Sequence, residues 1–315
     1  EQSGNLSVKS GSTLANISMK NSGQLTIESS AVTDVLSTES KNITVTDATI
    51  FPGGITMKLS NGSLTICDSK IGVQIDDEGQ GQEGSGGVSM LETKGDLLVV
   101  AEGACAASRI QGSVVVEKGE GKVRLVGAAL NGDLAVLEQT GEVVVDGSAC
   151  DGCATVGDVK VEKGKAGDIT LKAVTTDSDA TISENNGNVT IDSSVLGSDV
   201  SISRNRMVIM TKNSFSLEDV HVSGNSGTIV IDNNCDMRLT VNENIGAVTI
   251  SNNVGNAVAT CSSGFGFSDA DVMKNSGGVS ITKNTGEGLF CSGNNPAPTG
   301  SGNVVTFSDG QCAGF

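Results

Sequence analysis

Eight cysteines are the residues of this chain with the most specific chemistry. Cys150-Asp151-Gly152-Cys153 is a CxxC motif, a spacing found in zinc sites and in redox-active dithiols. A zinc site needs a second pair of ligands at suitable spacing, and the sequence has none. A thioredoxin-like dithiol needs a following helix in a βαβ unit, and no helical pattern is present. We therefore interpret the cysteines as structural disulfides, ahead of free thiols and of a redox or metal site: Cys67, Cys105, Cys150, Cys153, Cys235, Cys261, Cys291 and Cys312.

An acidic stretch is the best candidate for binding a cation. Residues 74–87 read QIDDEGQGQEGSGG, so Asp76, Asp77 and Glu78 place three carboxylates on a glycine-rich segment. Such hard oxygen ligands suit Ca²⁺. The twelve-residue calcium-loop pattern and the Gly-Gly-x-Gly-x-Asp nonapeptide run are both absent. A solvated acidic loop is the favoured interpretation, and we predict no cofactor.

Residues suited to catalysis are sparse. His221 is the only histidine, and it falls on the polar phase of an expected strand. No Ser-His-Asp or Cys-His arrangement is evident around it. Arg204 and Arg206 are close in sequence, and we expect them to decorate a strand edge. The sequence therefore predicts no catalytic activity.

Composition and charge restrict the partners. The 315 residues carry a formal net charge of -17, which argues against binding to nucleic acid or to anionic membranes. No apolar stretch is long enough to cross a bilayer, so membrane insertion is not expected. Cations, basic surfaces and neutral glycans are the favourable partners. Only 2% of the residues are aromatic, and Trp and Tyr are absent, so small aliphatic side chains must form the core.

The even number of cysteines and five Asn-x-Ser/Thr sequons favour an oxidising, secreted or cell-surface setting. The chain begins with Glu1, which a processed mature chain or a segment of a longer protein would explain. Four of the sequons lie in the first 61 residues, and the set comprises Asn5, Asn16, Asn42, Asn61 and Asn188.

A short sequence motif recurs along nearly the whole chain and includes or flanks most of the residues named above. It reads Gly/Asn/Asp-x-apolar-x-apolar, as in Gly187-Asn188-Val189-Thr190-Ile191. The alternation of period two predicts short strands, and Gly, Asn, Asp and Ser between them form turns. Two series interleave, each with a step of about twenty residues. This step predicts an all-β chain with parallel coils of about twenty residues, in one solenoid domain over residues 1–315.

Three stretches interrupt the rhythm, and we expect them to be loop insertions: residues 74–87, 261–269 and 291–302. The last two contain Phe265, Phe267 and two of the three prolines.

The Gly-x-Val-x-Ile-x-x-Asn phrases, such as Gly246 to Asn253, resemble those of right-handed parallel β-helix proteins, the pectin-lyase-like superfamily. The resemblance covers most of the chain and implies the fold. It says little about function, because the superfamily includes lyases, hydrolases, adhesins and structural proteins. The Gly-His-Gly and Asn-Thr-Asp signatures of its polygalacturonase-type members are missing here. A non-catalytic structural or surface member is therefore expected.

Coil spacing also suggests how the cysteines pair. Cys291 and Cys312 lie about one coil apart, and neighbouring coils are about 4.8 Å apart, which is within reach of a disulfide. Extending this to nearest neighbours gives the pairings 67–105, 150–153, 235–261 and 291–312.

The function expected from these observations is structural. The strand pattern starts near residue 5 and continues to Phe307, with no helical cap evident at either end. Uncapped ends favour head-to-tail stacking of copies of the same chain into a filament or fibril. A cell-surface adhesin or glycan-binding β-helix, with Phe265 and Phe267 in its contact loop, is the alternative. A polysaccharide-degrading enzyme ranks third.

Overall fold

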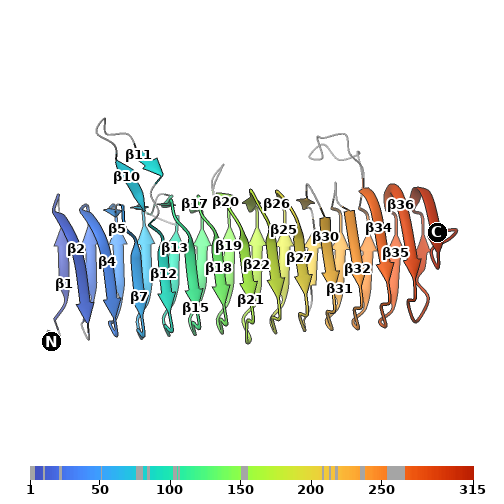
Figure 1. Cartoon of the computed structure of the whole chain (residues 1–315), viewed down its shortest axis with the longest axis horizontal. Coiled ribbons are helices and arrows are strands. Elements are labelled where there is room, and N and C mark those ends of the chain that lie inside the picture. The colour runs from blue at the N-terminus through green and yellow to red at the C-terminus, as the bar shows by residue number, and fades with distance from the viewer. Residues whose placement is uncertain are drawn as a thin grey trace. The chain divides into compact units, whose positions relative to one another are not determined.

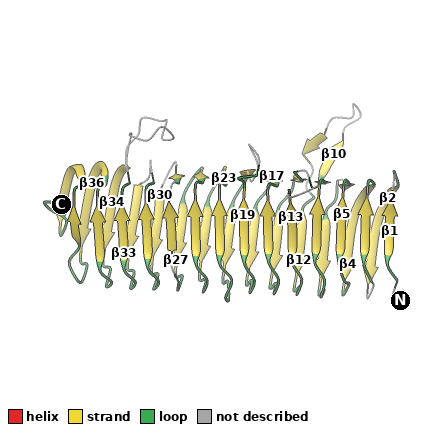
Figure 2. Cartoon of the chain, turned by 180° about the vertical axis from the view of Figure 1, so that it is seen from behind, coloured by secondary structure: helices red, strands yellow, loops and turns green. Residues whose placement is uncertain are grey.

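The computed structural model describes all residues except 1–3, 10, 21–22, 51, 76–80, 84–85, 102–104, 106, 150–154, 208, 213, 217–218, 235–237 and 254–266. The described part consists of strands, bends and turns and contains no helix, hence none that could span a membrane (Figure 2). It divides into two compact units, Glu1–Gly167 and Asp168–Phe315. Each unit is a parallel β-solenoid (Figure 1), as the repeat predicts. That residues 1–315 form one domain stays a prediction.

Each coil of the first unit places one strand in an A sheet and one in a B sheet, and short strands lie between them. The A strands are β1 (Leu6–Lys9), β3 (Leu25–Glu28), β5 (Ile43–Thr46), β8 (Leu64–Cys67), β13 (Leu97–Val100), β16 (Val123–Val126) and β19 (Val143–Asp146). The B strands are β2 (Thr13–Lys20), β4 (Ala31–Thr38), β7 (Ile55–Lys58), β12 (Val88–Leu91), β15 (Val114–Glu117), β18 (Leu134–Leu137) and β21 (Val159–Glu162). The short strands are β6 (Thr49–Ile50), β9 (Lys70–Ile71), β14 (Arg109–Ile110), β17 (Ala129–Leu130) and β20 (Thr155–Val156).

The second unit repeats this plan. Its A strands are β22 (Ile169–Lys172), β25 (Val189–Asp192), β28 (Ile209–Lys212), β31 (Ile229–Asp232), β33 (Val248–Ser251), β35 (Val279–Thr282) and β37 (Thr299–Ser301). Its B strands are β24 (Ala180–Ser183), β27 (Val200–Ser203), β30 (Asp219–Ser223), β32 (Arg238–Asn242), β34 (Phe267–Met273), β36 (Thr285–Ser292) and β38 (Val304–Gly310). Its short strands are β23 (Thr175–Thr176), β26 (Val195–Leu196) and β29 (Phe215–Ser216).

The core of each unit is built from columns of like side chains. In β25, Val189 and Ile191 point inward and are buried, while Thr190 between them is half-buried on the outward side. Val189 pairs with Ile169, twenty positions earlier, so aliphatic side chains stack on aliphatic side chains. Each fully buried aliphatic side chain contributes roughly 1.5–3 kcal/mol. Each inward residue must fit against the coils on both sides of it. This requirement explains why the same few aliphatic residues recur along the sequence.

The corner after most B strands combines strain with a buried polar side chain. Residues such as Glu138 and Arg204 have φ of 55° and 57°, in the left-handed region that disfavours residues other than glycine. The next residue turns inward and is buried, as with Ser60 in the first unit and Asn205 in the second. These inward polar side chains bond from coil to coil and hold the corner in this conformation.

In the second unit the inward corner residues form an asparagine ladder. The amide Nδ2 of Asn225 donates to the carbonyl of Ile202 at 3.1 Å and to Oδ1 of Asn244 at 3.0 Å. Its own Oδ1 accepts from the backbone N–H and from Nδ2 of Asn205, at 2.8 and 3.2 Å. The same contacts recur from coil to coil, and the ladder comprises Asn185, Asn205, Asn225, Asn244, Asn275 and Asn294, ending on Gln311.

The first unit uses more varied residues at the same corner, mostly smaller than asparagine. Ser60 Oγ, for example, accepts from the backbone N–H of Ser40 at 3.2 Å. A second asparagine series follows the A strands of the second unit, from Asn234 through Asn253 and Asn284 to Asn303. The two units therefore share a coil plan but differ in how their corners are bonded.

Glycine recurs at the turn before the A strands because successive turns nearly touch there. A Cβ on Gly141 would lie 1.9 Å from the carbonyl oxygen of Gly121, and a Cβ on Gly121 would lie 2.2 Å from that of Gly95. No side chain fits in such contacts, which accounts for the glycine that opens so many of the repeated phrases.

Leu59 provides a test of the corner strain. It has φ of 50° and is 52% exposed, so it bears the left-handed conformation without burying its side chain. We expect Leu59→Asn to raise the free energy of unfolding by roughly 1 kcal/mol, because asparagine tolerates this region better. Guanidinium chloride titration followed by circular dichroism measures the change. The same replacement at Leu36, an exposed residue of β4, should give no gain; a gain at both positions would contradict the argument.

Of the three expected insertions, one is clearly a protrusion. Residues 73–75 and 81–83 form an antiparallel pair, β10 (Val73–Ile75) with β11 (Gly81–Glu83), which stands away from the coils of the first unit (Figure 1). Residues 261–266 lie outside the described part, and 267–269 already belong to strand β34. Residues 291–302 correct the expectation, because they follow the regular coil: they end β36, contribute Asn294 to the ladder and form β37. Coil register therefore overrides the local Gly, Pro and Ser content there.

Candidate functional site

The strands at the outer coils present unpaired edges. Within the described residues, β1 and β2 each pair on one edge only, with β3 and β4. In the second unit, β37 and β38 likewise pair only with β35 and β36 among the strands that the structure describes. Unpaired N–H and C=O groups on such edges are a template for another strand.

Apolar side chains cluster on these same strands. Leu6 and Leu14 stand in register with Leu25 and Val32, which are each 1% exposed, yet they are themselves 40% and 39% exposed. They belong to the core columns but have no further coil to cover them among the described residues. On β38, Val304 is 67% exposed and Phe307 is 54% exposed.

The outer coils of both units are slightly shorter than twenty residues. Thr13 of β2 pairs with Ala31, eighteen positions on, and Thr285 of β36 pairs with Val304, nineteen positions on. Several other coils take nineteen to twenty-one positions, as between Val220 and Leu239 and between Ile43 and Leu64. The B strands at these outer coils are long, with eight residues in β2 and seven in β38.

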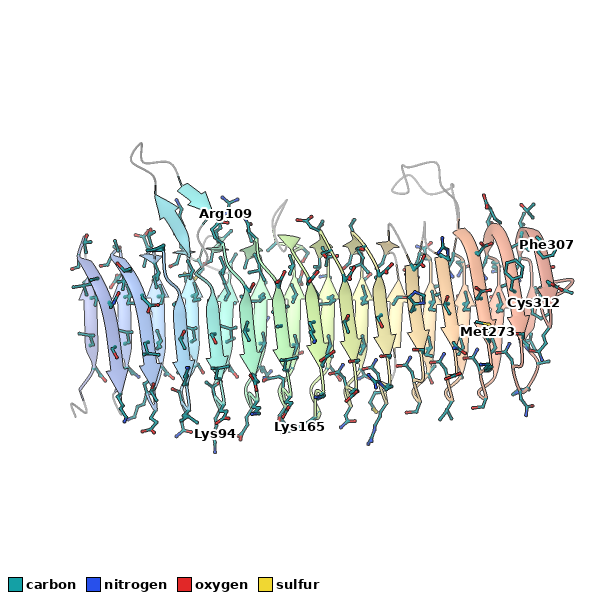
Figure 3. All side chains as sticks on the ribbon, in the orientation of Figure 1. Lys94, Arg109, Lys165, Met273, Phe307 and Cys312 are labelled. Carbon is teal, nitrogen blue, oxygen red and sulfur yellow. A yellow bond between two sulfur atoms is a disulfide. The ribbon has the colours of Figure 1, made fainter. Side chains whose placement is uncertain are left out.

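The end at β38 differs from the bare edge expected there. After β38 the chain turns, and Cys312 is fully buried and bonded to Cys291 (Figure 3). The ring of Phe315 lies against Gly300 of β37, where a Cβ would come within 2.4 Å of Phe315 Cδ2. Gly300 occupies the column of the buried Ile281, so the phenylalanine ring covers the core at this coil. The strand edges stay unpaired in the described part, but the core beneath them is partly closed.

Two of the four expected disulfide pairings are present. Cys67 bonds to Cys105 and Cys291 to Cys312, each with a Cα–Cα distance of 5.2 Å, within the usual range for a disulfide. The pairings 150–153 and 235–261 stay predictions, because all four of their cysteines lie outside the described residues: Cys150, Cys153, Cys235 and Cys261. The disulfides fit an oxidising environment.

Removing the Cys291–Cys312 bond tests how much it stabilises the second unit. Replacing both cysteines with alanine is expected to lower the free energy of unfolding by about 2 kcal/mol, because the bond closes a loop in the unfolded chain. The midpoint of guanidinium chloride unfolding, compared with and without reductant, measures the effect. Reductant should shift the midpoint less in the double variant than in the unaltered chain. Equal shifts would mean that another disulfide accounts for the stabilisation.

The other candidates of the sequence do not converge on a site. Asp76, Asp77 and Glu78 lie outside the described residues, and within the described ones no group of three metal-ligating side chains comes together. His221 Nε2 lies 3.9 Å from Asp219 on an exposed face, and Arg238 holds that same carboxylate at 3.0 Å. Arg204 pairs with Glu184 at 3.1 Å, and Arg206 is exposed.

The sequons differ in accessibility. Asn188 is half-buried, and its Nδ2, the atom that glycosylation would modify, donates to Asp168 at 3.1 Å. The other four are exposed and all lie in the first unit: Asn5, Asn16, Asn42 and Asn61.

No protein family model, no curated protein and no solved structure matches this chain. The parallel β-helix is therefore established from the strand pairing of the chain itself.

One cluster was missed by the sequence reasoning, which singled out Phe265 and Phe267. Phe290 of β36 and Phe307 of β38 point outward, with ring centroids 5.6 Å apart. Both occupy strand positions that the alternation predicts to face outward, where polar residues are usual. An aromatic residue at such a position is the sequence signal that could have identified the cluster. Phe265 lies outside the described residues, and Phe267 opens strand β34.

Proposed function

We propose that this chain is an extracellular structural protein whose copies stack head-to-tail into a filament or fibril. The observation that carries the proposal is the pair of outer coils, in each of which strand edges are unpaired among the described residues and apolar side chains are exposed. Stacking β38 of one copy on β2 of the next would bury Leu14, Val304 and Phe307 in one continuous sheet. A heterologous contact of this kind does not close on itself unless rotation closes a ring, so it propagates.

Several further features support this setting. The disulfides favour an oxidising compartment, and the exposed sequons would place glycans on the sides of the coils, which we propose are modified after secretion. We also propose that the protein has no catalytic activity and no cofactor, as the scarcity of catalytic residue types in the sequence suggests. We further propose that it is a non-catalytic relative of the pectin-lyase-like superfamily.

Sedimentation velocity over a wide concentration range, together with negative-stain microscopy of the same samples, tests the proposal. We expect a concentration-dependent shift from monomer to long particles of uniform width. A chain that stays monomeric at every concentration, with its disulfides intact, would overturn it.

A cell-surface adhesin or glycan-binding β-helix is the second candidate, favoured by the outward ring pair of Phe290 and Phe307, of which Phe307 is exposed. Binding to a glycan array by monomeric protein, lost in Phe307→Ala, would favour it. A polysaccharide-degrading enzyme stays the third candidate and would require release of soluble oligosaccharides.

A further inference from the structure

A shallow pocket of about 400 Å³ opens on the outward face of the last B strands of the second unit. Asp269 of β34 and Glu287 of β36 line it together with Phe290 and Phe307. Asp269, Gly288 and Phe307 stand in one row across three neighbouring strands, so the lining comes from successive coils in register.

Gly288 forms the floor of this pocket. A Cβ on Gly288 would lie 2.3 Å from Asp269 Oδ1 and 2.6 Å from Cε2 of the Phe290 ring. A carboxylate and an aromatic ring therefore approach the same point above the floor. The second ring, of Phe307, is tilted by 43° to the first, and it is 54% exposed, so the pocket is open to ligands.

The charges in the pocket are not neutralised by the protein. Neither Asp269 nor Glu287 forms an ion pair with any residue that the structure describes. No lysine or arginine is among the described residues that line the pocket, and segment 254–266, which precedes β34, contains none in its sequence. Two carboxylates and two aromatic rings thus meet without a cation.

We propose that this pocket binds an organic cation, an alkylammonium or guanidinium group. Aromatic faces attract such cations through their quadrupole, within about 6 Å of the ring centroid. The carboxylates add charge attraction and accept the N–H bonds of the cation. A hydrated metal ion would gain little from the rings, and a neutral sugar would gain nothing from the carboxylate charges. The pocket opens on the face of the sheet, but Phe307 lies on β38, so end-to-end stacking on that strand would compete with ligand binding.

Titration of protein with ¹³C-labelled phenylalanine, followed by NMR, tests the assignment at concentrations where the chain is monomeric. The probes are arginine amide and tetramethylammonium, with CaCl₂ and glucose in separate arms. We expect the Phe290 and Phe307 signals to shift with both organic cations, at millimolar affinity, and not with glucose or Ca²⁺. A lysine- and arginine-rich peptide in a further arm distinguishes a basic protein partner from a free small cation by its tighter binding.

Two variants sharpen the test. Phe307→Ala removes an exposed ring, so the fold should survive, and we expect roughly tenfold weaker binding. Glu287→Gln should weaken binding similarly, and raised salt should mimic it. Glu39→Gln, an exposed carboxylate of the first unit, is the control and should change nothing. Unchanged affinity in Phe307→Ala, or equal shifts with glucose, would overturn the proposal.

Discussion

The double variant Leu6→Glu, Leu14→Glu is expected to abolish self-assembly while the chain still folds. Both leucines stand in core columns of the outermost coil, yet they are 40% and 39% exposed, so a glutamate at either position stays in water in the monomer. In a stacked pair the same positions would be buried, and each carboxylate would have to lose its hydration without a partner. We expect the concentration needed for assembly to rise at least roughly 100-fold, equivalent to about 3 kcal/mol.

A matched control is available in the same unit. Leu36 of β4 is also 40% exposed, but it lies on the outward face of a strand that is paired on both edges. Leu36→Glu should therefore assemble as the unaltered chain does. Sedimentation velocity and microscopy of all three proteins give the comparison, with circular dichroism to verify folding. Filaments formed equally by the double variant would remove this end from the interface, and equal loss in the control would point to a general charge effect.

Replacing Asn225 with alanine should cause the largest loss of stability in the second unit, about 4 kcal/mol. The side chain is fully buried and takes part in four hydrogen bonds to neighbouring coils. Its removal leaves the backbone N–H of Asn205 and the carbonyl of Ile202 without those partners in a dry interior. Each such buried group costs roughly 1–3 kcal/mol, and the neighbouring ladder residues lose their continuity.

Two control variants distinguish the contribution of the ladder from the general effect of replacing an asparagine. Asn225→Ser keeps a short acceptor, as Ser60 does for Ser40 in the first unit, and should lose about half as much. Asn61→Ala, at an exposed position, should change the unfolding free energy by less than about 0.5 kcal/mol. Denaturant titration and hydrogen exchange of the ladder amides measure these effects. A loss for Asn225→Ala no greater than that for Asn61→Ala would show that the ladder adds nothing to stability.

Period-two alternation was sufficient to predict the strands. In Val189-Thr190-Ile191, for example, the apolar residues mark the inward face and the polar residue between them marks the outward face. The step of about twenty residues was sufficient for parallel coils, since only coils place Ile169 beside Val189. The Gly, Pro and Ser content of residues 291–302 predicts a loop. Their conformation is set instead by the coil beneath, through Asn275 and Asn294.

The pocket at Phe290 could not be predicted in the same way. Its lining comes from β34, β36 and β38, and Asp269 meets Phe307 only after two coil steps of nineteen residues place them in one row. Sequence pattern gives the phase of each strand but not this exact count across turns of variable length.

The asparagine ladder gives the second unit a direction. Between side chains, each amide from Asn205 to Asn275 donates toward the coil that follows it in the chain and accepts from the coil that precedes it, while Nδ2 also donates back to a carbonyl of the preceding coil. The local dipoles consequently point one way, and reversing the unit would present acceptors where donors stood. The two terminal faces are never chemically equivalent, so a mirror-like dimer that joined two identical faces would interrupt the chain of amides. Copies stacked in the same orientation would repeat this polarity in every second unit, although serine at the corner of the first unit means that the amides themselves do not run on from copy to copy.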